Sequence, residues 1–111
     1  MKICIIGSGY VGLVSGACFS DLGNTVTCVD NNKEIIDKLN KGIIPIYEPG
    51  LQELVERNIE KKRLIFSNDI SSSIKKSDIL FICVGTPTKN NKANLKYVYN
   101  VVKSIKSNLN K

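Results

Sequence analysis

The stretch ICIIGSGYVGLVSG, from Ile3 to Gly16, decides how this chain folds. It begins as a short apolar run, passes through three glycines at Gly7, Gly9 and Gly12, and continues with small and apolar residues. A short apolar run that ends at glycines is typical of a buried strand, which we predict over residues 2–6. The residues after the glycines predict a helix, so the glycines lie in a strand-to-helix turn.

This G-x-G-x-x-G pattern predicts a phosphate-binding turn, because it lies inside a β-α-β unit. Gly7 would allow the tight turn, Gly9 would let a diphosphate approach the backbone, and Gly12 would let the helix pack closely on the strand. The free N–H groups and the dipole at the start of the helix favour an anion. A glycine turn that binds nothing is the alternative.

Asp30 is the second residue that points to a dinucleotide. The β-branched run TVTCV predicts a second strand over residues 25–29, and Asp30 follows at its tip, 18 residues after Gly12. A carboxylate at this place accepts hydrogen bonds from the adenosine ribose hydroxyls and repels a 2′-phosphate. We therefore predict NAD rather than NADP as the cofactor, although an Asp unrelated to any ligand is also compatible with the pattern.

Strands and helices continue to alternate along the chain. Further strands are predicted over residues 64–66 and 79–84, and GTPTKNNKAN is predicted to be a polar loop. On one face of the first predicted helix lie Val14, Ala17, Cys18 and Leu22, and the second, capped by Asn31 or Asn32, has Ile35, Ile36 and Leu39 inward. The third predicted helix has Leu51, Leu54, Val55 and Ile59 inward, and the fourth covers residues 69–76. The last is capped by Asn94 and has Leu95, Val98, Val102, Ile105 and Leu109 inward.

The resulting order, β-α-β-α-α-β-α-β-α, indicates an α/β fold. It predicts a doubly wound parallel sheet of Rossmann type with strand order 3-2-1-4. A complete dinucleotide fold has six strands, and two of them have no counterpart here. We therefore expect residues 1–111 to be one NAD-binding domain, truncated, with any substrate-binding and catalytic domains outside this chain.

Composition and charge narrow the class of protein. The 42% hydrophobic content suits a globular domain, and no apolar run approaches the roughly 20 residues of a membrane span. The N-terminus lacks the pattern of a signal peptide, so we expect a cytoplasmic protein. Residues 1–59 carry five Lys or Arg and seven Asp or Glu, and residues 60–111 carry eleven and three. These lysines are dispersed, which favours a solvated basic surface over a nucleic-acid partner.

The four cysteines, Cys4, Cys18, Cys28 and Cys83, form no C-x-x-C pair, and the chain has no histidine. This pattern does not predict a zinc site or any other metal site. Each cysteine lies within an apolar segment, so we expect buried, reduced thiols that act as small hydrophobic residues.

The predicted fourth strand ends at Val84, and the sequence GTPT follows it. Ligands of this fold lie beyond the carboxyl ends of the strands, near the switch point between the first and fourth strands. Gly85 and Thr86 are therefore predicted to meet the cofactor. A plain turn built on glycine and proline is the alternative.

Four stretches together resemble the NAD-binding domain of the UDP-glucose/GDP-mannose dehydrogenase family. They are IGSGYVGLVSG, VTCVDNN, PIYEPGL and DILFICVGTPT, and the resemblance in order and spacing covers essentially the whole chain. It implies that Asp30 holds the adenosine ribose, that Thr86 lies near the nicotinamide half, and that the pyrophosphate is lined by Gly7, Gly9, Tyr10, Val11 and Gly12.

The family often has a basic residue five positions after the ribose carboxylate, and Ile35 stands there in this chain. The motif Tyr47–Leu51 is typical of the family, and we expect Glu48 to cap a helix that has Pro49 in its first turn. Direct contact of this motif with a nucleotide sugar is the alternative.

The resemblance also implies the reaction. It implies two successive NAD-dependent oxidations of a primary alcohol to a carboxylate through a covalent cysteine intermediate. That cysteine lies in a G-x-C-x-P-K-D setting, which none of the four cysteines here has. We therefore expect no catalytic residue in this chain, no turnover by the chain alone, and a homo-oligomer for a full-length enzyme.

Several alternatives remain open from the sequence. The resemblance favours UDP-glucose as the substrate of the full-length enzyme, and GDP-mannose or a UDP-N-acetylhexosamine is the alternative. Two other hypotheses are a nucleotide-sensing regulatory domain and a remnant without function. A nucleotide-sensing domain also carries G-x-G-x-x-G and an acidic residue that binds the ribose.

Overall fold

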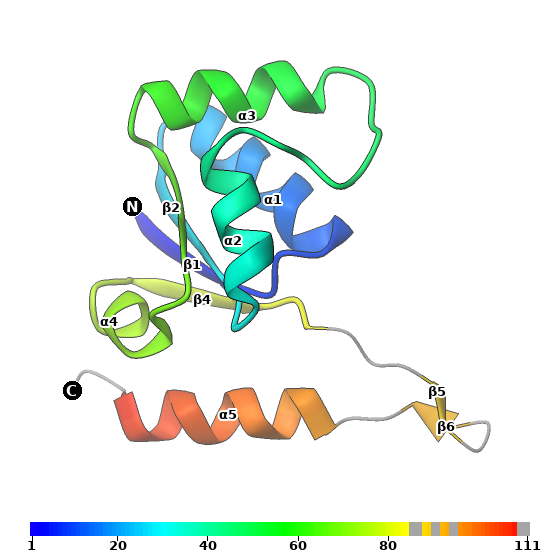
Figure 1. Cartoon of the computed structure of the whole chain (residues 1–111). Coiled ribbons are helices and arrows are strands. Elements are labelled where there is room, and N and C mark those ends of the chain that lie inside the picture. Colours follow the sequence, from blue (N-terminus) through cyan, green and yellow to red (C-terminus); the bar gives the residue numbers. More distant parts are fainter. Residues whose placement is uncertain (85–87, 90–91, 94–95, 109–111) are drawn as a thin grey trace.

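The computed structural model describes residues 1–84, 88–89, 92–93 and 96–108. Its centre is a four-stranded sheet made of β1 (Lys2–Ile6), β2 (Thr25–Val29), β3 (Leu64–Ser67) and β4 (Ile79–Ile82) (Figure 1). The strand order is β3-β2-β1-β4 and every pairing is parallel. The predicted Rossmann-type α/β fold, with order 3-2-1-4, is confirmed.

Helices cover both faces of this sheet. They are α1 (Tyr10–Asp21), α2 (Lys33–Asn40), α3 (Leu51–Glu60), α4 (Ile70–Lys75) and α5 (Lys96–Asn108). Figure 1 shows α1, α2 and α3 on one side of the sheet and α4 and α5 on the other. This arrangement follows from parallel strands, since each crossover has to return over a face of the sheet.

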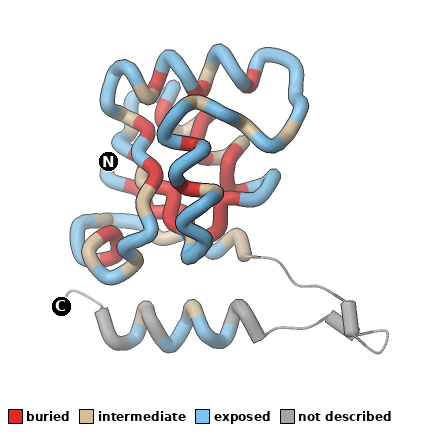
Figure 2. The backbone as a smooth tube through the Cα atoms, in the orientation of Figure 1, coloured by how far each residue is buried: buried red, intermediate tan, exposed pale blue. Residues whose placement is uncertain are grey.

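Two hydrophobic cores result, one on each face (Figure 2). The larger core lies under α1, α2 and α3, and its centre includes Ile5, Leu13, Val26 and Leu39, all fully buried. The smaller core joins β1 and β2 to α4 and α5. Strands with buried residues on both faces read as continuous apolar runs, which is why β1 was recognisable in the sequence.

Side-chain caps fix the start of two helices, α2 and α4, close to where the sequence predicts them. The side chain of Asn32 accepts a hydrogen bond from the Ile35 N–H at 3.3 Å, which decides between the two asparagines proposed for α2. The Asp69 carboxylate accepts one from the Ser72 N–H at 3.1 Å at the start of α4. Such side-chain acceptors pair N–H groups that have no partner within the helix.

The predicted inner face of α1 was correct for Ala17 and in part for Val14, and wrong for Cys18 and Leu22. The buried residues are Gly12, Leu13, Gly16, Ala17 and Ser20, whereas Cys18 and Leu22 are exposed and Val14 is only half-buried. A Cβ on Gly16 would lie 2.7 Å from the Cys28 sulfur, so small residues are what allow α1 to approach β2. Hydrophobic spacing misses such a face, because it selects large apolar residues.

The structure also differs from the prediction at the end of the fourth strand and on the inner face of the last helix. Strand β4 ends at Ile82, and Ile79, Phe81 and Ile82 are between 37% and 40% exposed, because β4 lies at the edge of the sheet. In α5, Ile105 packs towards the smaller core as predicted, whereas Val102 is exposed and Val101 packs there in its place.

The segment predicted as a polar loop contains a short antiparallel pair, β5 (Thr88–Lys89) with β6 (Lys92–Ala93). The expected cap Asn94, and Leu95 and Leu109 of the predicted helix, lie outside the described residues. Among the described helices, none has the length and apolar character needed to cross a membrane.

Candidate functional site

Gly7 makes the turn that ends β1. Its φ is +107°, a conformation that residues with a Cβ rarely adopt, and its N–H donates to the carbonyl oxygen of Val29 at 2.7 Å. A Cβ here would also lie 2.6 Å from the carbonyl oxygen of Cys83. The turn is therefore wedged between the ends of β2 and β4, where only glycine fits.

Gly12 and Gly9 have different roles in the same motif. A Cβ on Gly12 would overlap the carbonyl oxygen of Gly7, so this glycine lets α1 lie against the turn. A Cβ on Gly9 would meet nothing within 4 Å. Gly9 is thus unnecessary for packing, and the open space beside its backbone suits the approach of a ligand.

The first turn of α1 is suited to an anion. Gly9 is the N-cap and supplies no side chain, and the first turn contains no acidic residue. The first intrahelical bond runs from the Leu13 N–H to the Gly9 carbonyl at 2.9 Å, so the N–H groups before Leu13 have no partner inside the helix. Tyr10 and Val11 flank this opening with exposed side chains. Together with the helix dipole, these N–H groups fit a diphosphate.

Asp30 lies against the glycine turn. One oxygen of its carboxylate accepts hydrogen bonds from the Ser8 N–H at 3.1 Å and the Ser8 hydroxyl at 2.8 Å. The other oxygen accepts from the Asn32 N–H at 2.9 Å. The carboxylate is half-buried, so it is oriented by the protein while part of it still faces solvent.

Ser8 was not predicted as a site residue from the sequence. It is 3% exposed and lies between Gly7 and Gly9. A signal did exist, because Ile6 and Val29 are register partners at the ends of parallel strands. Residues that follow paired strand ends lie at the same edge of a sheet, so Ser8 and Asp30 were candidates for contact.

The predicted contacts at the end of β4 are only partly described. Gly85 and Thr86 lie outside the described residues. The chain just before them is placed, since the Cys83 N–H donates to the Ile6 carbonyl at 2.8 Å. Cys83 thus continues beside β1, next to the glycine turn.

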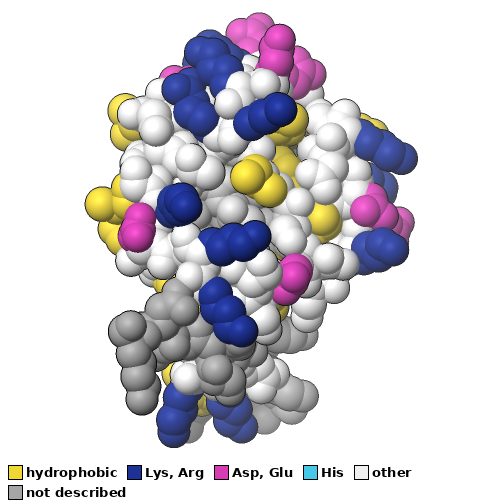
Figure 3. Space-filling model, turned by 90° about the vertical axis from the view of Figure 1, so that its left-hand side faces the viewer, with side chains coloured by type: hydrophobic (Ala, Val, Ile, Leu, Met, Phe, Trp, Pro, Cys, Tyr) yellow, Lys and Arg dark blue, Asp and Glu magenta, His cyan; other side chains and the backbone are white. Residues whose placement is uncertain are grey.

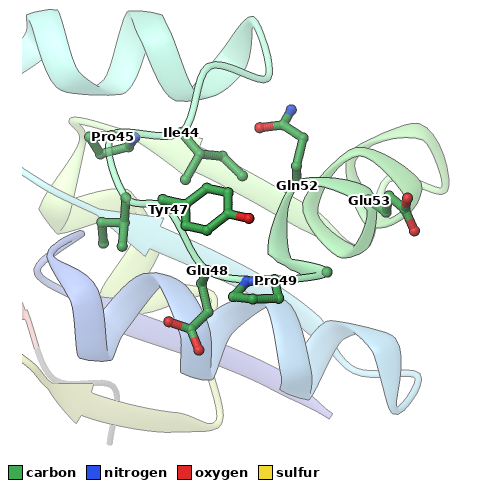
Figure 4. A pocket seen from close by; sticks show the side chains of 9 residues that line it. Ile44, Pro45, Tyr47, Glu48, Pro49, Gln52 and Glu53 are labelled. Atoms are coloured by element: carbon green, nitrogen blue, oxygen red, sulfur yellow. The ribbon is translucent and has the colours of Figure 1, made fainter.

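The expectation that Glu48 caps a helix was wrong. Helix α3 begins at Leu51 with Gly50 as its N-cap, and no side chain caps it. The Glu48 carboxylate instead accepts a hydrogen bond from the Tyr10 hydroxyl at 3.0 Å. The segment also borders a hollow of about 470 Å³ between Ile44 and Glu53 (Figure 4).

Ile35 stands where the family often has a basic residue. Its N–H belongs to the cap of α2, and its side chain packs partly against the larger core. Neighbouring Lys33 is exposed at the first position of α2. The side chain of Ile35 therefore serves packing in this chain.

The thiols divide into two groups. Burial raises the pKa of Cys4 to about 11 and that of Cys28 to about 12, and it also raises the pKa of Cys83. Such thiols stay protonated near neutral pH and are poor nucleophiles. Cys18 is exposed and Cys83 is only half-buried, so the expectation of buried thiols is confirmed for Cys4 and Cys28 and wrong for the other two.

The described part of the chain holds no clustered metal ligands. No group of three or more His, Cys, Asp or Glu residues there is arranged to hold a metal ion. On the face shown in Figure 3, the Lys and Arg side chains are spread out, with acidic side chains at several places.

Fold and site together define a class of protein. A parallel sheet of order 3-2-1-4, a glycine turn opening onto a helix N-terminus and a carboxylate at the tip of β2 make a Rossmann-type dinucleotide-binding domain. The family model described as "UDP-glucose/GDP-mannose dehydrogenase family, NAD binding domain" matches residues 1–111. The chain therefore belongs to this family, as its NAD-binding domain.

Individual relatives agree with this assignment. The chain is 54% identical over 110 residues to a UDP-glucose 6-dehydrogenase of Bacillus subtilis, covering 98% of this chain and 24% of the relative. It is 50% identical over 111 residues to the UDP-glucose 6-dehydrogenase of Rhizobium meliloti, covering 98% and 25%. The chain thus spans about a quarter of the length of these relatives.

Solved structures show the same fold. A GDP-mannose dehydrogenase from Pseudomonas aeruginosa, in a ternary complex, matches with a TM-score of 0.91 and 42% identity, over 95% of this chain and 24% of that one. A UDP-glucose dehydrogenase from Pyrobaculum islandicum matches with a TM-score of 0.89 and 35% identity, over 94% and 24%.

Proposed function

We propose that this chain is the cofactor-binding part of a UDP-glucose 6-dehydrogenase, which oxidises UDP-glucose to UDP-glucuronate with two NAD. The support is the 54% and 50% identity to proteins of that name. The catalytic cysteine and the nucleotide-sugar site would belong to parts of the enzyme outside these 111 residues. NAD, when bound, supplies the hydride acceptor for such an oxidation.

Within the site we assign two roles. The N–H groups at the start of α1 bind the pyrophosphate, in the turn formed by Gly7, Gly9, Tyr10, Val11 and Gly12. Asp30 binds the adenosine ribose. The observation that carries the assignment is the pair of hydrogen bonds from Ser8, which orients the Asp30 carboxylate beside the glycine turn. Gly85 and Thr86 stay predicted cofactor contacts, with Thr86 near the nicotinamide half.

Calorimetric titration of the chain with NAD and NADP tests these roles. We expect NAD to bind more tightly than NADP, because the Asp30 carboxylate repels a 2′-phosphate. Asp30→Asn should weaken NAD binding and narrow the difference between the two cofactors. Asp37→Asn is the matched control, since Asp37 is an exposed carboxylate on α2. Equal affinity of the wild-type chain for both cofactors would contradict the role given to Asp30.

The nucleotide sugar of the whole enzyme has a second candidate. The 42% identity to a GDP-mannose dehydrogenase of known structure favours GDP-mannose as the alternative substrate. Purifying the native protein with an antibody against this segment gives both its mass and material for an assay. A product several times heavier than 12.3 kDa that reduces NAD only with UDP-glucose supports our proposal. A product near 12.3 kDa, or a preference for GDP-mannose, contradicts it.

We also propose a cytoplasmic location and a homo-oligomeric assembly for the complete enzyme. The support is the resemblance to the family. Cell fractionation with the same antibody, followed by size-exclusion chromatography with light scattering, tests both statements.

A further inference from the structure

A hydrogen bond joins two motifs that lie far apart in the sequence. The Tyr10 hydroxyl, in the glycine-rich stretch, donates to Oε2 of Glu48 at 3.0 Å. Glu48 belongs to the segment between α2 and α3, residues 41–50, which we name the connector. Figure 4 shows the Glu48 side chain pointing towards α1, away from Gln52 and Glu53. The roles assigned above to the dinucleotide site do not use Glu48.

The connector is itself anchored at several points. The side-chain amide of Gln52 donates to the Gly42 carbonyl at 2.7 Å and to the Glu56 carboxylate at 2.7 Å. Ile44 and Ile46 pack against the larger core. Glu48 is therefore presented from a segment that is fixed to α3 and to the core.

Tyr10 needs such an anchor. It is the first residue of α1 and follows Gly9, an N-cap that has no side chain to bond the first turn. The Tyr10 side chain is 52% exposed, so packing alone does not orient it. Helix ends without a cap fray, and fraying here would disorder the N–H groups that face the diphosphate.

The bond leaves the anion-binding groups free. In the described part of the chain, no hydrogen bond joins the Glu48 carboxylate to the N–H groups of α1, only to the Tyr10 hydroxyl. The contact also changes the phenol itself, since the hydrogen bond to Glu48 and its negative charge raise the pKa of Tyr10. Glu48 thus acts on the side chain of Tyr10 and not on the ligand.

We propose that Glu48 is a positioning residue of the dinucleotide site: by holding Tyr10 it keeps the first turn of α1 aligned for the diphosphate. The inference rests on the proposed function, because it assumes that NAD binds at this helix terminus. The negative charge of Glu48 opposes an anion nearby, so the benefit comes from the hydrogen bond and not from the charge.

The test compares variants that separate the hydrogen bond between Tyr10 and Glu48 from the negative charge of Glu48. Glu48→Ala removes both, Glu48→Gln keeps an acceptor without the charge, and Tyr10→Phe removes the donor. Glu53→Ala and Tyr47→Phe are matched controls, since both residues are exposed at the same hollow and make no described hydrogen bond. NAD affinity is measured by calorimetry at a temperature at which thermal unfolding curves show every variant to be folded.

We expect Glu48→Ala and Tyr10→Phe each to raise the Kd for NAD about threefold or more, the effect of one lost hydrogen bond. The double variant should be no worse than either single one, because both remove the same bond. Glu48→Gln should bind NAD at least as tightly as wild type, and both controls should match wild type. Additive losses, or an equal loss in Glu48→Gln and Glu48→Ala, would overturn the proposal.

The outcomes also separate this inference from the proposed function. If wild type binds NAD and Glu48→Ala binds it equally well, only the positioning role fails. If wild type does not bind NAD, the proposed function fails and the inference with it. A pH titration of phenol absorbance, with Tyr10→Phe to identify the signal, checks the contact without NAD. The pKa of Tyr10 should fall towards its ordinary value in Glu48→Ala, and an unchanged pKa would show that the bond is not formed in solution.

Discussion

The hydroxyl of Ser8 donates to the carboxylate of Asp30 at 2.8 Å, and the Ser8 N–H donates to the same oxygen at 3.1 Å. This pair of bonds ties the glycine turn after β1 to the tip of β2, across 22 residues of sequence. The two parts of the proposed dinucleotide site are therefore built as one unit, in which the Asp30 carboxylate is oriented before any ligand arrives. Preorganisation of this kind lowers the entropic cost of binding.

Ser8→Ala should weaken this unit without removing it. The hydroxyl bond is lost and the N–H bond remains, so we expect a loss of stability of about 0.5–1.5 kcal/mol. The Kd for NAD should also rise, because the carboxylate becomes less well oriented. Urea unfolding and calorimetry measure the two effects. Ser71→Ala, at an exposed position of α4, is the control. Unchanged stability in Ser8→Ala would show that the buried hydroxyl bond contributes little.

Substitutions at Gly9 and Gly7 should have different effects on stability and on NAD binding. Gly9→Ala adds a methyl group where no atom lies within 4 Å, so stability should change by less than about 0.5 kcal/mol. The methyl group would occupy the approach of the diphosphate, so NAD binding should weaken at least about tenfold.

Gly7→Ala is the contrasting variant. Its Cβ would clash with the Cys83 carbonyl at a φ of +107°, so we expect a stability loss of about 2 kcal/mol or more. Thermal unfolding monitored by circular dichroism compares the two variants. If Gly9→Ala bound NAD like wild type, the diphosphate would not lie beside Gly9.

Asp21 should make stability depend on acid pH. Hydrogen bonds from Arg57, and then from Asn58, lower the pKa of Asp21 in the folded chain. Its contribution is therefore present above the unfolded-state pKa of about 3.9 and is lost as pH falls through the lower folded-state pKa. We expect Asp21→Asn to have a lower Tm than wild type at pH 7 and a similar Tm near pH 2. Asp37→Asn should follow wild type throughout, and a constant Tm difference for Asp21→Asn would contradict the linkage.

The cysteines should react in a set order. Cys18 is exposed on α1, whereas Cys4 and Cys28 are buried and their pKa values are raised to about 11 and about 12. Iodoacetamide at pH 8 should therefore label Cys18 first, and Cys4 and Cys28 only after unfolding. Peptide mass spectrometry over a time course measures this order. Early labelling of Cys28 would mean that β2 opens readily.

The chain alone should show no dehydrogenase turnover. The buried thiols are protonated near neutral pH, and no cysteine here has the sequence setting of the family's nucleophile. NADH absorbance at 340 nm is followed with UDP-glucose and NAD. Steady NADH production by the pure chain would contradict this prediction.

Some parts of the molecule needed the structure because they depend on contacts between distant segments. The inner face of α1 is lined by Gly12, Gly16 and Ser20, which no hydrophobic pattern selects. The role of Glu48 followed from its contact with Tyr10, 38 residues earlier, and local sequence had indicated a cap instead. Half-exposure of Phe81 followed from the place of β4 at the sheet edge, where it stacks on Phe19 at 5.3 Å between ring centroids.

The fold class, the strand order and the cofactor class could all be predicted from the sequence of this chain. They follow from short-range signals: apolar runs, helical spacing and the spacing of the glycines. Which side chains complete the site depended on the folded arrangement of distant segments. Ser8 orients Asp30, and Glu48 bonds Tyr10, because the parallel sheet brings strand ends together and the connector returns to α1. Hydrogen bonds of this kind depend on atom positions that residue order does not specify.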